Sequence, residues 1–150
     1  MFVDRTESYI VSDESLLGGE QVLPIHPRTA LQWIAVIRQG IPSAASESLT
    51  KTLRMTQSEL AASLGIPERT LARRKKEGMF NSEESAKLVR LARVVERAGE
   101  VFEDLDAALD WLKSPNAALS GVTPLSMLDT DIGAETVLDT LGRIEHGVFA

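Results

Sequence analysis

Apolar residues recur at helical spacing through most of the chain, and the clearest stripe lies in the stretch 82–98. Its members fall at positions i, i+3, i+4 and i+7: Leu88, Leu91, Ala92 and Val95. This spacing is typical of one face of an α-helix. Asn81 and Glu84 have the spacing of a capping box, which pairs the free backbone groups at a helix start. We therefore expect a helix that begins near Asn81 and runs to about Gly99.

Weaker stripes predict further helices before and after this one. Their apolar members are Leu31, Ile34, Ala35 and Ile37; Leu49 and Leu53; Val101, Leu105, Ala108, Leu109 and Leu112; and Val137, Leu141 and Ile144. Each set is typical of the face that a helix packs against a core. Residues 1–27 show no sustained period, so we expect a loose arm there, with Glu20–Ile25 as a weak strand candidate. The sequence therefore predicts an all-α fold.

The stretch Thr56–Lys76 predicts two short helices joined by a tight turn, which is the pattern of a helix-turn-helix. The Thr56 hydroxyl can cap the first helix, and Gly65 tolerates the positive φ that a tight turn requires. The apolar residues expected to hold the pair at its angle are Leu60, Leu64, Ile66 and Leu71. Because the second helix of this motif fits the major groove, the stretch predicts a DNA ligand.

The second helix of this motif carries the candidate DNA contacts. At base edges or phosphates we expect Arg69, Thr70, Arg73 and Arg74, and at phosphates we expect Gln57, Lys75 and Lys76. Arginine forks onto guanine, and threonine contacts the thymine methyl group. A run of cations is also common on a solvated helix face, so the prediction depends on motif and charge together. Reading two half-sites of an operator requires a homodimer.

Charge is distributed unevenly, which reconciles a DNA ligand with a net charge of -6. Residues 51–80 hold seven Lys or Arg against three Asp or Glu, whereas residues 98–150 hold two against ten. Phosphates respond to charge within about a Debye length, so the basic middle matters more than the total. The chain contains no cysteine, which excludes disulfides and thiolate zinc sites. It opens without a signal-peptide pattern and has no long apolar run, so we expect a cytoplasmic protein that does not enter membranes.

The C-terminal third contains a second distinctive pattern. Its elements are Trp111-Leu112, Pro115-Asn116, Leu119, Gly121, Pro124-Leu125 and Gly133, followed by Val137, Leu141, Arg143, Ile144 and Gly147. This series resembles the C-terminal domain of the Xre/MbcA/ParS antitoxins. Upstream, Gly40-Ile41-Pro42 and the stretch Leu64–Arg74 are similar to the same family. The resemblance runs from about Thr29 to the end of the chain, and two motifs in the right order make it specific.

The resemblance implies a type II antitoxin that occludes the active site of a RES-domain toxin and represses the shared operon. RES-type toxins degrade NAD+, so the cofactor belongs to the partner and we expect none in this chain. The toxin-binding positions that the resemblance implies are Trp111, Pro115, Asn116, Leu119, Gly121, Pro124, Leu125, Gly133, Arg143, Ile144 and Gly147. Large apolar members of this set more often pack in a core, and its glycines serve backbone geometry.

The end of the chain gives a separate hypothesis for direct toxin contact. Val148, Phe149 and Ala150 could enter a basic nucleotide-binding cleft of the toxin while Arg143 pairs with an acidic wall. The alternative interpretation is a frayed terminus, because chain ends are commonly mobile.

Three regions follow from these motifs. We expect an N-terminal arm at 1–28, a helix-turn-helix domain at 29–98 and a C-terminal toxin-binding domain at 99–150. Two other functions remain open: a stand-alone DNA-binding regulator whose C-terminal domain mediates self-association, and a scaffold that recruits other proteins. A toxin gene beside this one would favour the antitoxin.

Catalysis is not expected from the residue content. His26 and His146 lie in different contexts, and no nucleophile stands beside a candidate base. Asp129 and Asp131 flank Thr130 but lack the twelve-residue calcium-loop pattern, so we expect no metal and a helix cap from Thr130 or Asp131.

Overall fold

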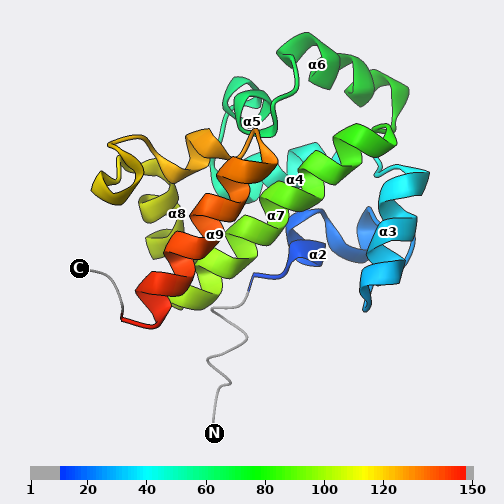
Figure 1. Cartoon of the computed structure of the whole chain (residues 1–150). Coiled ribbons are helices and arrows are strands. Elements are labelled where there is room, and N and C mark those ends of the chain that lie inside the picture. The colour runs from blue at the N-terminus through cyan, green and yellow to red at the C-terminus, as the bar shows by residue number, and fades with distance from the viewer. Residues whose placement is uncertain (1–10, 148–150) are drawn as a thin grey trace, which may run out of the picture.

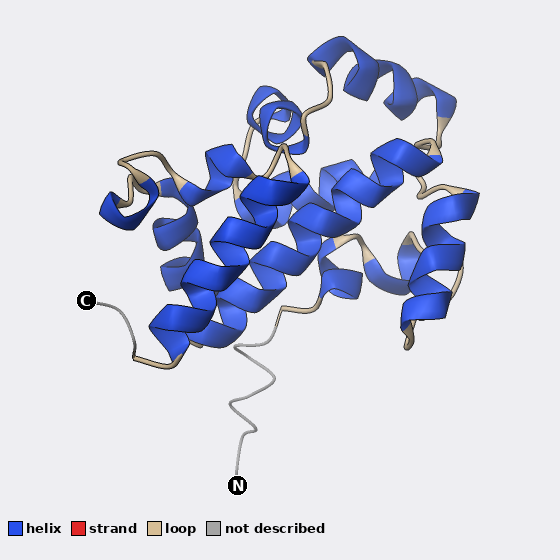
Figure 2. Cartoon of the chain, in the orientation of Figure 1, coloured by secondary structure: helices blue, strands red, loops and turns tan. Residues whose placement is uncertain are grey.

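The computed structural model describes residues 11–147, and every regular element in that range is a helix (Figures 1 and 2). In chain order the elements are α2 (Asp13–Leu16), the 3-10 helix η1 (Gly19–Gln21), α3 (Ala30–Gln39), α4 (Ala44–Leu53), α5 (Gln57–Leu64), α6 (Glu68–Glu77), α7 (Ser82–Phe102), α8 (Leu105–Lys113), the 3-10 helices η2 (Ala117–Leu119) and η3 (Pro124–Met127), and α9 (Asp131–Glu145). The all-α prediction is confirmed. The segment Glu20–Ile25 contains a 3-10 turn and coil in place of the strand considered from sequence.

Helix α7 is the central element of the fold, and the other helices are arranged around it (Figure 1). Its start is the predicted capping box: the Asn81 side chain accepts from the Glu84 N–H at 2.8 Å, and the Glu84 carboxylate accepts from the Asn81 N–H at 2.9 Å. The predicted apolar stripe lies wholly in the core. Helices α8 and α9 pack against α7, as do α2 and α3 from the N-terminal part.

Helix α7 is longer than the sequence predicts. Its pattern was expected to end near Gly99, but the helix continues to Phe102 and Gly99 is buried within it. A glycine weakens a helix by only about 1 kcal/mol relative to alanine, which tertiary packing offsets. The chain turns instead at Glu103, which has a φ of 57°, and the Asp104 side chain then caps α8.

Residues 11–27 of the N-terminal segment contribute to the core. The prediction of a loose arm is therefore wrong for these residues. Leu16 and Leu17 are fully buried and Leu23 is nearly so. The Asp13 N–H also donates to the Glu96 carboxylate of α7 at 2.9 Å. Two adjacent leucines at the end of a four-residue helix produce no periodic pattern, so their burial was not visible from the sequence.

Helix α3 buries a different face from the predicted one. Thr29 caps it, but Leu31 is 78% exposed and Ile34 is 40% exposed. Trp33 and Val36 point into the core instead. The Trp33 ring also lies 5.9 Å from the Arg93 guanidinium of α7, a cation–π contact that fixes the rotation of α3. The larger aromatic side chain therefore determines which face packs.

Candidate nucleic-acid and partner interfaces

Local capping and a glycine turn build the α5–α6 pair as the sequence predicts. The Thr56 hydroxyl accepts from the Glu59 N–H at 3.1 Å, and the Glu59 carboxylate accepts from the Thr56 N–H at 2.8 Å. The backbone hydrogen bond from Thr56, followed by the one from its hydroxyl, holds the pKa of Glu59 below its ordinary value. Gly65 ends α5 with a φ of 70°. The chain then re-enters a helix at Glu68.

The inner face of the α5–α6 pair is apolar, as predicted. Leu60, Leu64, Ile66 and Leu71 are all buried. Ala61 is also buried on the inner side of α5, where its small side chain allows close packing. These contacts orient α6 so that its opposite face is solvent-exposed along the molecular edge (Figure 1).

The exposed face of α6 carries most of the predicted DNA contacts. Arg69, Arg73 and Lys76 are exposed and, with Ala72, line a shallow hollow of about 240 Å³. Thr70 is half-buried beside them. Two further members lie at the margins: Gln57 is half-buried at the start of α5, and Lys75 pairs with Glu47 of α4 at 3.1 Å. An exposed, cationic helix face of this kind suits a groove lined by phosphates.

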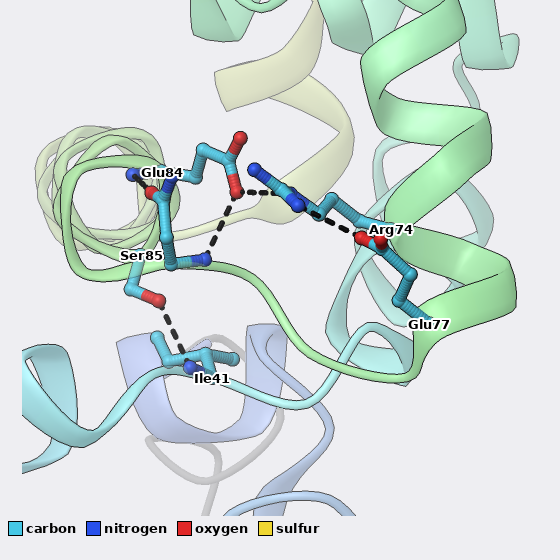
Figure 3. A network of polar contacts seen from close by, with 6 residues as sticks. Ile41, Arg74, Glu77, Glu84 and Ser85 are labelled. Atoms are coloured by element: carbon cyan, nitrogen blue, oxygen red, sulfur yellow. Dashed lines mark hydrogen bonds and ion pairs between the residues drawn. The ribbon is translucent and has the colours of Figure 1, made fainter.

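Arg74, the remaining predicted DNA contact, is held by two carboxylates (Figure 3). Its Nε donates to Glu84 at 2.8 Å and its Nη1 donates to Glu77 at 2.8 Å. The hydrogen bond that Arg74 donates to Glu84, followed by the one that it donates to Glu77, raises the pKa of Arg74. The side chain is only 21% exposed. Two nitrogens of its guanidinium, Nε and Nη1, are therefore engaged in hydrogen bonds within the protein.

In the C-terminal half, two of the implied toxin-binding residues build a backbone turn. The Asn116 side chain accepts from the Ala118 N–H at 2.8 Å and caps η2. The Asn116 carbonyl accepts from the Gly121 N–H at 2.8 Å, and the Asn116 N–H donates to the Val122 carbonyl at 3.0 Å. Gly121 has a φ of 84°, which a turn of this kind requires. Asn116 and Gly121 therefore set the path of the loop.

Gly133 and Pro124 are also packed into the backbone of this half. Gly133 lies in the first turn of α9, and a Cβ atom there would be 1.8 Å from the Met127 carbonyl oxygen. Its N–H donates to the Thr130 hydroxyl at 2.9 Å, which confirms Thr130 as the cap of α9. Pro124 is buried at the start of η3. Only a residue without a side chain allows η3 and α9 to approach this closely.

The apolar members of the implied toxin-binding set differ in burial. Leu119 is buried, whereas Trp111 and Leu125 are half-buried. The Trp111 ring packs on Phe102 at the end of α7, with ring centroids 5.7 Å apart and an interplanar angle of 41°. Pro115 is exposed.

The end of α9 presents the remaining implied residues. Arg97 of α7 forms a two-pronged ion pair with Glu145 at 2.5 and 3.0 Å, which holds the last turn of α9 in place. The hydrogen bonds from Arg97 hold the pKa of Glu145 below its ordinary value. Next to this pair, Arg143 and Gly147 are exposed and Ile144 is half-buried. The predicted contacts Val148, Phe149 and Ala150 lie outside the described residues.

Cations that the sequence analysis did not single out as site residues link elements that are distant in the sequence. Lys113 of α8 donates to the Leu53 carbonyl at the end of α4, at 2.6 Å. Lys87 of α7 donates to the Gly65 carbonyl at 3.2 Å, in the turn of the α5–α6 pair. Arg90 reaches the Leu128 carbonyl at 3.0 Å and pairs with Asp131. Charged residues beside an apolar stripe look alike in sequence, so no signal distinguished these from solvated ones.

A shallow groove of about 410 Å³ marks the line along which α5 meets η3. It is lined by Glu59, Ala62, Ser63, Thr123, Leu125, Ser126 and Asp129. Gly65 also lies here, since a Cβ atom on it would be 3.2 Å from both the Cβ and the carbonyl oxygen of Asp129. The boundary placed at 98/99 from sequence falls inside α7, which both halves share.

Two further features of residues 11–147 concern metal binding and membrane insertion. Within that range no three His, Cys, Asp or Glu side chains are grouped to hold a metal ion. None of the helices described is both long enough and apolar enough to span a membrane.

Two family models match consecutive parts of the chain. Residues 32–93 match the antitoxin Xre-like helix-turn-helix domain. Residues 97–147 match the antitoxin Xre/MbcA/ParS C-terminal toxin-binding domain. The first match contains α5 and α6, and the second contains the loop with Asn116 and Gly133.

Whole-chain relatives agree with these matches. An antitoxin Xre from Photorhabdus laumondii is 35% identical over 118 residues, covering 77% of this chain and 80% of the relative. An antitoxin Xre from Yersinia enterocolitica is 33% identical over 144 residues, covering 83% of this chain and 97% of the relative. A chain of the M. tuberculosis MbcT–MbcA toxin–antitoxin complex has the same fold, with a TM-score of 0.54, 23% identity, and coverage of 72% of this chain and 96% of that one. The chain therefore belongs to the Xre antitoxins and is the antitoxin of a toxin–antitoxin system, with an Xre-like helix-turn-helix domain and a C-terminal toxin-binding domain.

Proposed function

We propose that this antitoxin neutralises a RES-domain toxin that degrades NAD+, and that as a homodimer it represses its own operon through α6. The observation that carries the DNA half of the proposal is the exposed cationic face of α6, formed by Arg69, Arg73 and Lys76. The RES identity of the toxin follows from the family resemblance. Both activities are binding activities in the cytoplasm, where the operator and NAD+ are found.

The proposed DNA contacts divide by position. Arg69, Thr70 and Arg73 read base edges, because they lie on the exposed side of α6. Gln57, Lys75 and Lys76 contact phosphates on either side. We assign residues 29–98 to this activity and 99–150 to toxin binding, with α7 common to both.

The proposed toxin-binding residues divide into contacts and supports. Arg143, Ile144 and the tail 148–150 touch the toxin, with Gly147 between them. Pro115, Trp111 and Leu125 supply further contact surface, since Pro115 is exposed, Trp111 is partly exposed and Leu125 lines the groove. The supports are Asn116, Leu119, Gly121, Pro124 and Gly133, which keep this segment in shape. An acidic half with one exposed arginine complements a basic cleft.

A reciprocal pair of variants tests the division of labour. Arg73→Ala should weaken operator binding by about 10- to 100-fold, the range for a bidentate base contact, and should leave toxin neutralisation intact. Arg143→Ala should weaken toxin inhibition and leave operator binding intact. Gel shift with the promoter fragment and NAD+ levels in cells co-expressing the adjacent toxin gene measure the two activities. Loss of both activities by either variant, with the helical circular-dichroism signal retained, contradicts the division.

Two truncations test the tail. A chain that ends at Gly147 retains the Arg97–Glu145 pair and lacks Val148, Phe149 and Ala150, so it should bind the toxin but inhibit it poorly. A chain that ends at Gly142 should lose inhibition altogether. Full neutralisation by the chain that ends at Gly142 contradicts insertion of this end into the toxin.

A further inference from the structure

The connection between α6 and α7 is fastened at several points (Figure 3). The Ser43 N–H donates to the Gly78 carbonyl at 2.8 Å, and the Phe80 N–H donates to the Ile41 carbonyl at 2.9 Å. The Ile41 N–H in turn donates to the Ser85 hydroxyl of α7 at 2.9 Å. The start of α7 is therefore fixed against the loop between α3 and α4.

Arg74 joins the last turns of α6 to this fixed point. Glu84 is 8% exposed, and one of its carboxylate oxygens accepts from both the Arg74 Nε and the Asn81 N–H. Burial opposes ionisation of Glu84, but hydrogen bonds from Arg74 and Asn81 outweigh it and lower the pKa of Glu84. Glu84 is thus a buried, charged acceptor that needs its arginine.

Moving Arg74 onto DNA would leave the Glu84 carboxylate buried without its cation. Separating such a pair is unfavourable, because the remaining charge has lost both water and its partner. Arg73, the next residue along α6, is exposed and faces the hollow with Arg69 and Lys76. Two adjacent arginines therefore occupy two different environments.

We propose that Arg74 is a positioning residue that sets the orientation of α6 through Glu84, and that it does not itself contact the operator. This inference rests on the proposed DNA-binding function of α6. It assigns DNA-binding importance to Glu84, an acidic residue of α7 that touches no DNA. It also ties the orientation of α6 to the helix that supports the toxin-binding half.

The effect of neutralising Glu84 on operator affinity distinguishes a positioning role of Arg74 from a direct contact with DNA. If Arg74 acts on DNA through its charge, Arg74→Ala weakens binding and Glu84→Gln strengthens it, because the latter removes a negative charge. If Arg74 positions α6, both variants weaken operator binding, by about 10-fold each, and the double variant is no weaker than either one. Glu77→Gln is the matched control: this glutamate also pairs with Arg74 but is half-exposed, so its loss should not weaken binding.

Salt dependence provides a second criterion. Loss of a phosphate contact lowers the slope of log affinity against log salt by about 1, which we expect for Lys76→Ala. Arg74→Ala should leave that slope unchanged. A slope reduced by about 1 in Arg74→Ala, or stronger binding by Glu84→Gln, overturns the proposal.

Amide hydrogen exchange makes the test independent of DNA. Arg74→Ala and Glu84→Gln should each speed exchange in the last turns of α6 at least 10-fold, while Arg73→Ala and Glu77→Gln should leave it unchanged. Unchanged exchange in the first two variants overturns the positioning role. If the unmodified protein fails to shift the operator, the proposed function fails, and exchange still decides whether Glu84 and Arg74 hold α6.

Discussion

The α5–α6 pair and the segment 116–133 are built from the same local features, but their distinctive residues serve different purposes. Both consist of short helices with a side-chain cap and a glycine at positive φ. In the α5–α6 pair, buried leucines hold the geometry and exposed cations remain available for a ligand. In segment 116–133, the distinctive residues themselves hold the geometry: Asn116 caps, Gly121 turns and Gly133 allows a close approach.

This difference shows how far a motif reveals its own function. A helix has two faces, so residues that support it and residues that bind can be separated by spacing alone. A compact segment such as 116–133 has no separate supporting and binding faces. Its characteristic residues serve to set the path of the backbone. For the C-terminal half, the motif therefore identifies a shape, and the contacts with the toxin are expected largely on the surfaces that this shape presents.

The largest effect is expected from adding a methyl group at Gly133. The new Cβ would lie 1.8 Å from the Met127 carbonyl oxygen, so Gly133→Ala should lower the free energy of unfolding by about 3 kcal/mol. Gly142→Ala on the same helix is the matched control, because nothing lies within 4 Å of its Cβ and alanine favours a helix. It should be neutral or stabilising by up to about 1 kcal/mol. Urea titrations measure both.

The same variants test the comparison functionally. If segment 116–133 acts as a shape, Gly133→Ala should reduce toxin affinity far more than operator affinity. Equal losses would mean that the two halves unfold as one unit, and unchanged stability would mean that η3 and α9 can separate without a penalty.

Local signals in the sequence predicted most of the fold. Thr56 and Asn81 cap their helices as expected, since capping depends on residues three positions apart. The predictions that were wrong concern side chains whose packing depends on residues distant in the sequence. Leu31 was expected in the core, but Trp33 packs there and contacts Arg93 of α7, and the sequence gives no sign of that contact.

The candidate site was predictable by region but not by residue. The cationic helix was located correctly, yet Arg73 and Arg74 are adjacent and chemically identical, and only the position of Glu84 distinguishes them. Glu84 was recognised as part of a capping box, which is correct, but its second bond crosses between helices. The spacing of residues in the sequence predicts contacts within a helix but does not predict contacts between helices.

A smaller effect is expected where the two regions touch. Gly65 and Gly121 both have positive φ, 70° and 84°, so alanine strains each by about 1 kcal/mol. At Gly65 the new methyl also meets Asp129 at 3.2 Å, whereas at Gly121 nothing lies within 4 Å. Gly65→Ala should therefore cost about 2 kcal/mol and Gly121→Ala about 1 kcal/mol. Equal losses in thermal unfolding would show that the contact between the halves is loose.

The smallest effect concerns Glu96, a partly buried carboxylate on the helix that both regions share. Burial, followed by the negative charges of Asp13 and Glu100, raises its pKa, although the Asp13 N–H and Arg93 act in the opposite direction. A carboxyl whose pKa is raised by folding stabilises the protein fully below about pH 4.5 and loses that contribution as the pH rises through the folded pKa. At neutral pH the ionised group is therefore slightly destabilising.

Glu96→Gln should remove this penalty while keeping an oxygen that accepts from the Asp13 N–H. We expect a gain of less than about 1 kcal/mol at pH 7, because part of the side chain remains hydrated, and almost no gain at pH 4, where the carboxyl is mostly protonated in both states. Glu100→Gln, at an exposed site one turn along α7, is the comparison: it removes only the smaller repulsion between Glu100 and Glu96, so its gain at pH 7 should be smaller than that of Glu96→Gln. Thermal unfolding at the two pH values measures the difference. A gain that persists at pH 4 would mean that glutamine improves packing, and a loss at pH 7 would mean that the charge of Glu96 holds the N-terminal segment against α7.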